Sequence, residues 1–307
     1  MTEVLSIDIM NHAPFVAPGL FGPEFQFREI QIMMETTFSS LRGATEGTVD
    51  TLWGTQVPLD GSAVADPTID MDAVLAKMDK ESCEIVVVTA TKMWSPYWHH
   101  GFIMNYPIEV VAEAVDQGGA RIIGAASYNP FRIMDSLAEI ESAVKDHGFR
   151  YVWFHPLSYG LAPNDRRFYP LYAKCQELEI AVGLQVGHSA EVLPSEPGRP
   201  MLVDDVAIEF PHLKINLSHT GWPWTGEFCS MIWRHPNVYG DISAYYPASL
   251  DPQLVQFMNR RPGRDKIMFG TNGLDAARCR AELLDLPISD KAKEQILAHN
   301  ARTFLGL

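Results

Sequence analysis

The sequence of 307 residues lacks several features that would restrict its class at once. It has no uncharged apolar run of transmembrane length and no basic, apolar N-terminal leader. Lys and Arg form no cluster, and the net charge is −14, so we expect neither a nucleic-acid nor a membrane partner. Its four cysteines (Cys83, Cys175, Cys229 and Cys279) are widely spaced without a CxxC pair. We therefore expect reduced, mostly buried thiols and a cytoplasmic protein.

Short apolar runs of strand length alternate with helical segments along most of the chain. The eight predicted strands span 4–9, 84–89, 121–126, 151–155, 181–186, 214–218, 238–242 and 266–269. Helices are predicted at 71–80, 107–117, 132–147, 166–178, 201–210, 226–234, 252–259, 276–284 and 290–305. Eight β/α units predict an α/β fold, a TIM-like (β/α)8 barrel in a single domain over 1–307. An open, doubly wound sheet is the alternative, but no GxGxxG motif supports it.

Residues 13–70 break this pattern and predict a long insertion after the first strand. The segment is rich in Pro, Gly and aromatic residues, with a short helix expected around 26–36. Long loops in compact domains are often lids or interfaces, so these two roles and plain packing all remain open. A second stretch, 94–105, is expected to be a solvated loop carrying Trp98, His99 and His100.

Histidines follow several of the predicted strands directly. His12, His155, His188 and His219 stand at the ends of the first, fourth, fifth and sixth strands. In a β/α barrel the strand C-termini share one face, and active sites are built there. Neutral imidazoles that converge at this face can bind a divalent metal such as Zn²⁺. The alternative is that each histidine separately hydrogen-bonds a loop.

Motifs spread over nearly the whole chain resemble the amidohydrolase superfamily, in its decarboxylase-like amidohydrolase 2 branch. The motifs are Phe154-His155-Pro156, 168–172, Gln185-Val186-Gly187-His188, 219–224, 236–239, 269–272 and 300–307. Similarity to this family implies a β/α barrel that holds one or two divalent metals. It also implies hydrolysis, decarboxylation or hydration of small acids and esters, and in a few relatives oxygenation at a bimetal site.

The departures from the family pattern fall on its metal positions. The family's first strand carries Asp-x-His-x-His, whereas here Met10 replaces the first histidine and only His12 remains. The family's last strand ends in an Asp that binds metal and acts as base, whereas here it is Asn272. Gln185 stands where many relatives place a ligand histidine. A thioether is a poor ligand for Zn²⁺, and an amide is not a base at neutral pH.

These departures lead to two hypotheses. The main one is that the chain is an accessory subunit, paired with a related barrel or with itself, in a metalloenzyme acting on a small acid. The alternative is a stand-alone mononuclear-metal hydrolase or decarboxylase that uses His12, His188 and His219, with His155 as a further ligand. A ligand-binding barrel without chemistry ranks below both. We expect at most one divalent metal, Zn²⁺ first, and no binuclear centre. Candidate pocket residues are Trp222, Trp224, Gln185 and Asn272.

Overall fold

The computed structural model describes residues 4–12, 27–33, 48–50, 56–58 and 70–307, with backbone only at 48–50 and 56–58. Eight parallel strands form the central sheet, in the order β1-β4-β7-β8-β9-β10-β11-β12. They are β1 (Ser6–His12), β4 (Cys83–Thr89), β7 (Ile122–Ala126), β8 (Tyr151–Phe154), β9 (Ala181–Gln185), β10 (Ile215–Ser218), β11 (Val238–Asp241) and β12 (Ile267–Met268). The predicted barrel and all eight of its strands are therefore confirmed.

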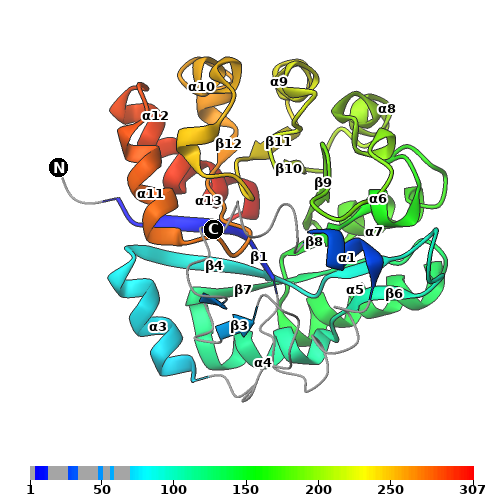
Figure 1. Ribbon diagram of the computed structural model, residues 1–307. Coiled ribbons are helices and arrows are strands. Elements are labelled where there is room, and N and C mark those ends of the chain that lie inside the picture. The colour runs from blue at the N-terminus through cyan, green and yellow to red at the C-terminus, as the bar shows by residue number, and fades with distance from the viewer. Residues whose placement is uncertain (1–3, 13–26, 34–47, 51–55, 59–69) are drawn as a thin grey trace.

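Helices surround the sheet as an outer layer (Figure 1). They are α3 (Met71–Lys80), α4 (Ile108–Gly118), α5 (Ile133–His147), α6 (Pro156–Tyr159), α7 (Tyr169–Glu177), α8 (Asp204–Glu209), α9 (Thr225–Arg234), α10 (Pro252–Met258), α11 (Ala276–Asp285), α12 (Asp290–Glu294) and α13 (Asn300–Leu305). Local sequence sets their ends: Asp70 caps α3 through the Ala73 N–H, and Gly148 ends α5 in a left-handed conformation. The outward strand faces and these helices share one large apolar cluster.

The barrel interior is a separate apolar cluster that includes Ile7, Ile9, Met10, Trp153 and Phe304. Phe304 belongs to α13, so the C-terminal helix contributes to the barrel core. A register shift in β1 between Asp8 and Asn11 places both Ile9 and Met10 in this cluster, although strict alternation would put them on opposite faces. The Met10 thioether therefore packs as core.

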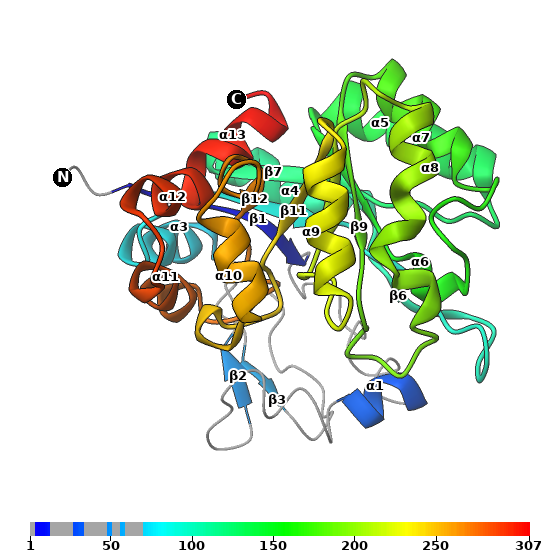
Figure 2. The same ribbon diagram turned by 90° about the horizontal axis from the view of Figure 1, so that it is seen from above.

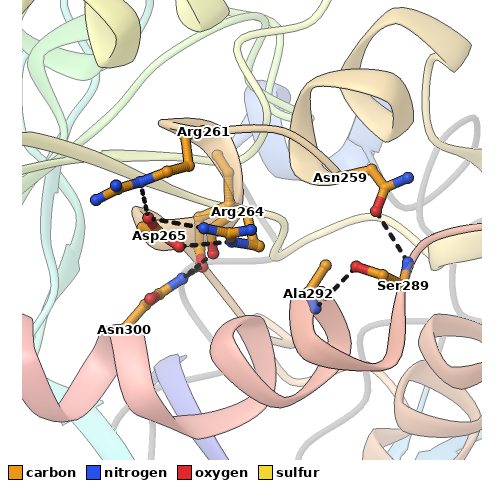
Figure 3. Close-up of polar contacts among 8 residues, drawn as sticks. Asn259, Arg261, Arg264, Asp265, Ser289, Ala292 and Asn300 are labelled. Carbon is orange, nitrogen blue, oxygen red and sulfur yellow. Dashed lines mark hydrogen bonds and ion pairs between the residues drawn. The ribbon is translucent and has the colours of Figure 1, made fainter.

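The end of the chain is fastened to the start of β12 through one amide (Figure 3). The Asn300 side chain donates to the carbonyls of Arg264 (2.8 Å) and Ile267 (2.6 Å). A π-helical turn, Gln295–His299, connects α12 to α13, and its Ile296 carbonyl accepts the Phe269 N–H at 2.9 Å. The single helix predicted over 290–305 is thus interrupted by a wider turn that supplies this bond.

The loop predicted at 94–105 is confirmed only for 95–101, which carry Trp98, His99 and His100 in an exposed turn, whereas its two ends are strands. They belong to an antiparallel hairpin of β5 (Lys92–Trp94) and β6 (Phe102–Asn105). Aromatic residues across the hairpin explain it, because Trp94 and Phe102 pack edge to face at 5.3 Å. Trp98 and His99 lie in the turn, where Trp98 is 43% exposed.

Most of the predicted insertion, 13–70, lies outside the described residues. Two parts are described: the short helix α1 (Arg28–Met33) and a small hairpin of β2 (Thr48–Asp50) and β3 (Gln56–Pro58). Both lie beyond the tip of β1, on the side where the parallel strands end (Figure 2). Met33, at the end of α1, is only 8% exposed and packs within the chain.

Candidate active site at the strand C-termini

Three of the four predicted histidines surround one tryptophan. The Trp153 ring lies 6.2 Å from His12, 5.9 Å from His155 and 6.1 Å from His219, centroid to centroid. The Trp153 indole N–H donates to the Ser218 hydroxyl at 3.0 Å, which fixes the plane of the ring. Sequence reasoning did not identify Trp153. Its signal was its position two residues before His155, on the same strand face.

His219 is held by a hydrogen-bonded chain that ends in a buried carboxylate. Its Nδ1 lies 2.6 Å from the Ser243 hydroxyl, and that hydroxyl donates to Asp241. Because the Ser243 proton goes to Asp241, Nδ1 of His219 must be the protonated nitrogen. Burial lowers the pKa of His219, and the nearby Asp241 opposes the shift. His219 is therefore neutral and carries its lone pair on Nε2.

The backbone around His219 is strained in a way that serves this arrangement. His219, Thr220 and Gly221 have φ values of 71°, 64° and 69°, a run of left-handed residues directly after β10. Asp241 holds the turn, since its carboxylate accepts the His219 N–H at 3.1 Å and its carbonyl accepts the Thr220 N–H at 3.1 Å. The side chain of Asn216 donates to the same carboxylate at 2.7 Å.

His155 has the opposite tautomer. The Ser158 backbone N–H donates to its Nδ1 at 3.1 Å, so the proton of the neutral ring sits on Nε2, 3.2 Å from the Ser189 hydroxyl. Burial and the neighbouring His219 and His12 lower the pKa of His155 to about 3, which keeps the ring neutral. With both nitrogens engaged, His155 is a hydrogen-bonded wall residue in this geometry.

His188 faces a different set of partners. Its ring lies 5.3 Å from Trp222 and 5.4 Å from Trp224, and its Nδ1 lies 2.7 Å from the Ser195 hydroxyl. The left-handed turn after His219 thus carries Trp222 and Trp224 toward His188. Trp222 is 49% exposed and forms part of the rim.

The remaining pocket candidates lie close to this centre. Gln185 ends β9 opposite Ser218, the neighbour of His219. Its amide nitrogen donates to the carbonyls of Val186 (3.4 Å) and His188 (3.2 Å), which fixes the amide group at the end of β9. Asn272 has φ 56°, and its N–H donates to the Met10 carbonyl at 2.8 Å. The residues at the two altered metal positions therefore meet across the seam between β1 and β12.

These donors are a poor fit for a divalent metal. Across the described ranges, no group of three or more His, Cys, Asp or Glu side chains is arranged to hold a metal ion. His219 offers a lone pair on Nε2, and the His12 Nδ1 lies 3.0 Å from the Thr91 hydroxyl. Met10 is in the barrel core, and Asn272 supplies no charge. Asp8 holds the residues beside His12, because it accepts hydrogen bonds from Met10, Asn11 and Thr271.

The Amidohydrolase family model matches residues 97–307, more than half of the chain. The chain belongs to the amidohydrolase family. No functionally curated protein matches it.

Solved amidohydrolase-like structures share the barrel over almost the full length. An uncharacterised TIM-barrel protein of Bordetella bronchiseptica is 22% identical, with a TM-score of 0.73 and 98% of each chain covered. A 2,6-dihydroxybenzoate decarboxylase from Rhizobium is 14% identical, with a TM-score of 0.64 and 99% of each chain covered. A 5-carboxyvanillate decarboxylase from Novosphingobium aromaticivorans, complexed with manganese and a nitrobenzoic acid, is 15% identical, with a TM-score of 0.64 and coverage of 99% and 96%. At these identities the likeness shows the fold.

Two further expectations can be compared with the structure of this amidohydrolase-family chain. All four cysteines are buried and unbridged, as predicted. None of the described helices has the length and apolarity needed to cross a bilayer.

Proposed function

We propose that this chain is a stand-alone enzyme that decarboxylates a small carboxylic acid, with His219 as its proton-transferring group. The observation that carries the proposal is the Asp241–Ser243–His219 chain, which leaves a neutral imidazole with its lone pair on Nε2 at the strand C-termini. A neutral, positioned imidazole can accept and return a proton near neutral pH. The similarity to two aromatic-acid decarboxylases supports this reaction class.

Each residue around His219 has a separate role in the proposed reaction. Asp241 and Ser243 hold the His219 ring in one tautomer and one orientation. His155 and Trp153 form a neutral wall, which favours a substrate whose charge is confined to its carboxylate. Gln185, whose amide nitrogen is bonded to two carbonyls, would offer its amide oxygen as a hydrogen-bond acceptor for a hydroxyl substituent. Trp222 and Trp224 line the rim beside His188 and would contact the apolar part of a bound substrate.

Metal dependence is a separate part of the proposal. The related decarboxylase named above binds manganese. In this chain the described donors around Trp153 are imidazoles and an amide. A metal held by His12 and His219 would be Zn²⁺ rather than Mn²⁺, because Mn²⁺ favours carboxylate ligands. We assign no step to a metal. Elemental analysis of the purified chain before and after chelation, together with an activity assay, tests whether the reaction needs a metal. Activity that persists after the metal has been removed would support a metal-independent reaction, and activity that depends on manganese would contradict it.

A hydrolase is the second candidate function. The neutral His219 supports it, because a lone pair on Nε2 can act as a general base that takes a proton from water as the water attacks an ester. Small lactones and esters are the substrates on which hydrolysis should be assayed.

The experiment compares carbon dioxide release from hydroxybenzoates with acid release from lactones, using the chain alone. His219→Asn should abolish either activity, since an amide cannot accept the proton. His212→Asn, on an exposed turn, is the matched control and should leave activity unchanged. Activity that survives His219→Asn would show that another group moves the proton. Complete inactivity of the wild-type chain, with activity only beside a related barrel, would support the accessory-subunit hypothesis instead.

A further inference from the structure

The connection after β9 is a loop whose two ends are held together beside the histidine centre. The Gly187 N–H donates to the Gly198 carbonyl at 2.7 Å, and the His188 N–H donates to the Trp222 carbonyl at 2.8 Å. The ends approach so closely that a Cβ atom added at Gly198 would lie 2.2 Å from the Gly187 carbonyl oxygen. Compact loops closed in this way are frequently functional. Residues 188–197 are therefore held as one unit that begins at the strand C-termini.

Ser189, inside this loop, joins His155 to a carboxyl group. Its hydroxyl donates to Oε2 of Glu191 and lies 3.2 Å from Nε2 of His155. A hydroxyl has one proton to give. Because that proton goes to Glu191, Ser189 must accept the bond at His155, and Nε2 must carry the ring proton. The Ser158 N–H, which donates to Nδ1 at 3.1 Å, independently requires the same tautomer.

Two hydrogen-bonded chains of the same kind therefore flank Trp153. Each runs from a histidine through a serine to a carboxyl group, and they are His219–Ser243–Asp241 and His155–Ser189–Glu191. Their effects differ. His219 keeps a lone pair on Nε2, whereas His155 gives its proton to Ser189 and its lone pair to the Ser158 N–H. His155 is also only 2% exposed, so it has no atom left for a substrate.

The described polar side chains at the ends of β8 and β9 have all their N–H groups engaged. His155 donates to Ser189, and the Trp153 N–H is likewise bonded to a serine. The amide nitrogen of Gln185 donates to two backbone carbonyls. Arg199, at the end of the same loop, is paired with two glutamates. A negatively charged substituent needs a donor or a cation when it leaves water, and this side of the site supplies neither.

We propose that Ser189 and Glu191 are positioning residues that set substrate specificity through His155. By engaging its N–H, they make the β8–β9 side of the site accept an uncharged substituent and reject a second carboxylate. The substrate is then a monocarboxylic acid rather than a dicarboxylic acid. This inference rests on the proposed function, which places the acid beside His219. Among the relatives described above, one decarboxylase is named for a monoacid and another for a diacid, so similarity alone does not decide the number of carboxylates.

Calorimetric binding of benzoate and isophthalate to the whole chain tests the inference without turnover. The two acids differ by one carboxylate. We expect benzoate to bind roughly tenfold more tightly or better, because the second carboxylate of isophthalate loses water without gaining a donor. In Ser189→Ala the freed Nε2–H of His155 becomes a donor, so this preference should shrink by roughly tenfold. Ser189→Thr retains a hydroxyl and should keep the wild-type preference.

Glu191→Leu is a second variant that tests the same chain, including the case in which Ser189→Ala does not fold. It removes the acceptor of the Ser189 hydroxyl, which then becomes a free donor, so the preference for benzoate should again shrink. Ser195→Ala is the matched control, because it removes a hydroxyl of the same loop that is bonded to His188 instead. It should leave the preference unchanged.

Nitrogen NMR of the His155 ring in the resting chain gives a readout that a general loss of stability would not produce. The wild-type chain and Ser189→Thr should show a slowly exchanging proton on Nε2, and Ser189→Ala should show fast exchange at the same nitrogen. A chain that prefers benzoate but releases no carbon dioxide from hydroxybenzoates would contradict the proposed function and still support this inference.

Three results would overturn the proposal. The first is a wild-type chain that binds isophthalate as tightly as benzoate, or that binds neither acid. The second is an unchanged preference in Ser189→Ala or Glu191→Leu, since the chain behind His155 would then not control the substituent. The third is a wild-type His155 without a proton on Nε2, because the hydrogen bond to Ser189 would then run in the opposite direction.

Discussion

Thr271 gives both of its hydrogen-bond donors to the carboxylate of Asp8. Its backbone N–H lies 2.9 Å from Oδ1, and its hydroxyl lies 2.6 Å from Oδ2. Asp8 is in β1, and Thr271 follows β12, so this pair bridges the first and last strands of the sheet. Two backbone bonds support it, from Ile9 N to Phe269 O at 3.1 Å and from Asn272 N to Met10 O at 2.8 Å. The barrel is thus closed by a side-chain clamp and two backbone bonds across the seam.

Thr271→Val tests this clamp, because it removes the hydroxyl but keeps the shape. We expect a loss of about 2 kcal/mol in the free energy of unfolding, the usual cost of losing a buried hydrogen bond to a charged group. Urea denaturation measures it. Thr303→Val removes a hydroxyl on the exposed side of α13 and should change stability by less than about 0.5 kcal/mol. Equal effects of the two variants would show that the seam does not depend on this bond.

Asp8 also makes stability depend on pH. Burial raises the pKa of Asp8 from 3.8 to about 6, against the opposing hydrogen bonds from Thr271, Met10 and Asn11. A raised pKa means that the native state binds the proton more tightly than the unfolded state. The Asp8 carboxyl therefore contributes its full stabilisation below pH 3.8, the pKa in the unfolded chain. This stabilisation is lost as pH rises through about 6, the pKa in the folded chain.

The comparison with Asp8→Asn isolates this contribution, since the amide does not titrate. Relative to that variant, the wild-type chain should lose up to about 3 kcal/mol of unfolding free energy between pH 4 and pH 7. Denaturation at a series of pH values measures the difference. Asp72→Asn, at an exposed position in α3, should show no such trend. A stability gap that stays constant with pH would contradict the prediction.

Substitution of Asn300 should lower the free energy of unfolding more than substitution of most other polar residues. It is 2% exposed, and its amide satisfies two backbone carbonyls at the start of β12 (Figure 3). Asn300→Asp replaces the donor by an acceptor and should cost at least about 3 kcal/mol. Asn259 is exposed and makes a single bond to the Ser289 N–H, so Asn259→Asp keeps its acceptor and should be nearly neutral. Thermal unfolding of the two variants checks the contrast.

Ser243→Ala tests how His219 is positioned. Without the hydroxyl, Nδ1 of His219 loses its partner, and the ring can adopt either tautomer. We expect a fall in kcat of roughly 10- to 100-fold on whichever small acid is turned over, as for lost partners of functional histidines. Nitrogen NMR of the His219 ring should show a mixed tautomer, a readout that a general loss of stability would not produce. Ser249→Ala, which removes an exposed hydroxyl in a neighbouring turn, is the control.

The pairing of this chain with a related barrel remains a prediction. The aromatic residues of the insertion that could form such an interface, among them Phe15, Phe21 and Phe25, lie outside the described part of the chain. Light scattering after size exclusion, for the chain alone and mixed with a related barrel, measures it. Phe25→Asp is a better test than Met33→Asp, because Met33 packs inside the α1 interface. A monomer with full activity would remove the need for a partner.

The sequence alone determined the barrel, because eight alternating β/α segments have few other ways to bury their apolar faces. It also placed His12, His155, His188 and His219 on one face, since parallel strands share their C-terminal edge. What it could not determine is which histidines face each other. The shift in β1 places Met10 in the core, and the left-handed turn after β10 carries Trp222 toward His188.

The hydrogen-bond directions were decided only in three dimensions. Ser243 and Ser158 fix opposite tautomers in His219 and His155, yet neither serine has a sequence signature that assigns this role. The docking of α1 is another such case, because Ile30 and Met33 are far in the sequence from Met93 and Ile103, which share their apolar cluster only in the folded chain. Local sequence sets elements and their faces, whereas contacts between distant loops depend on how strand ends bend.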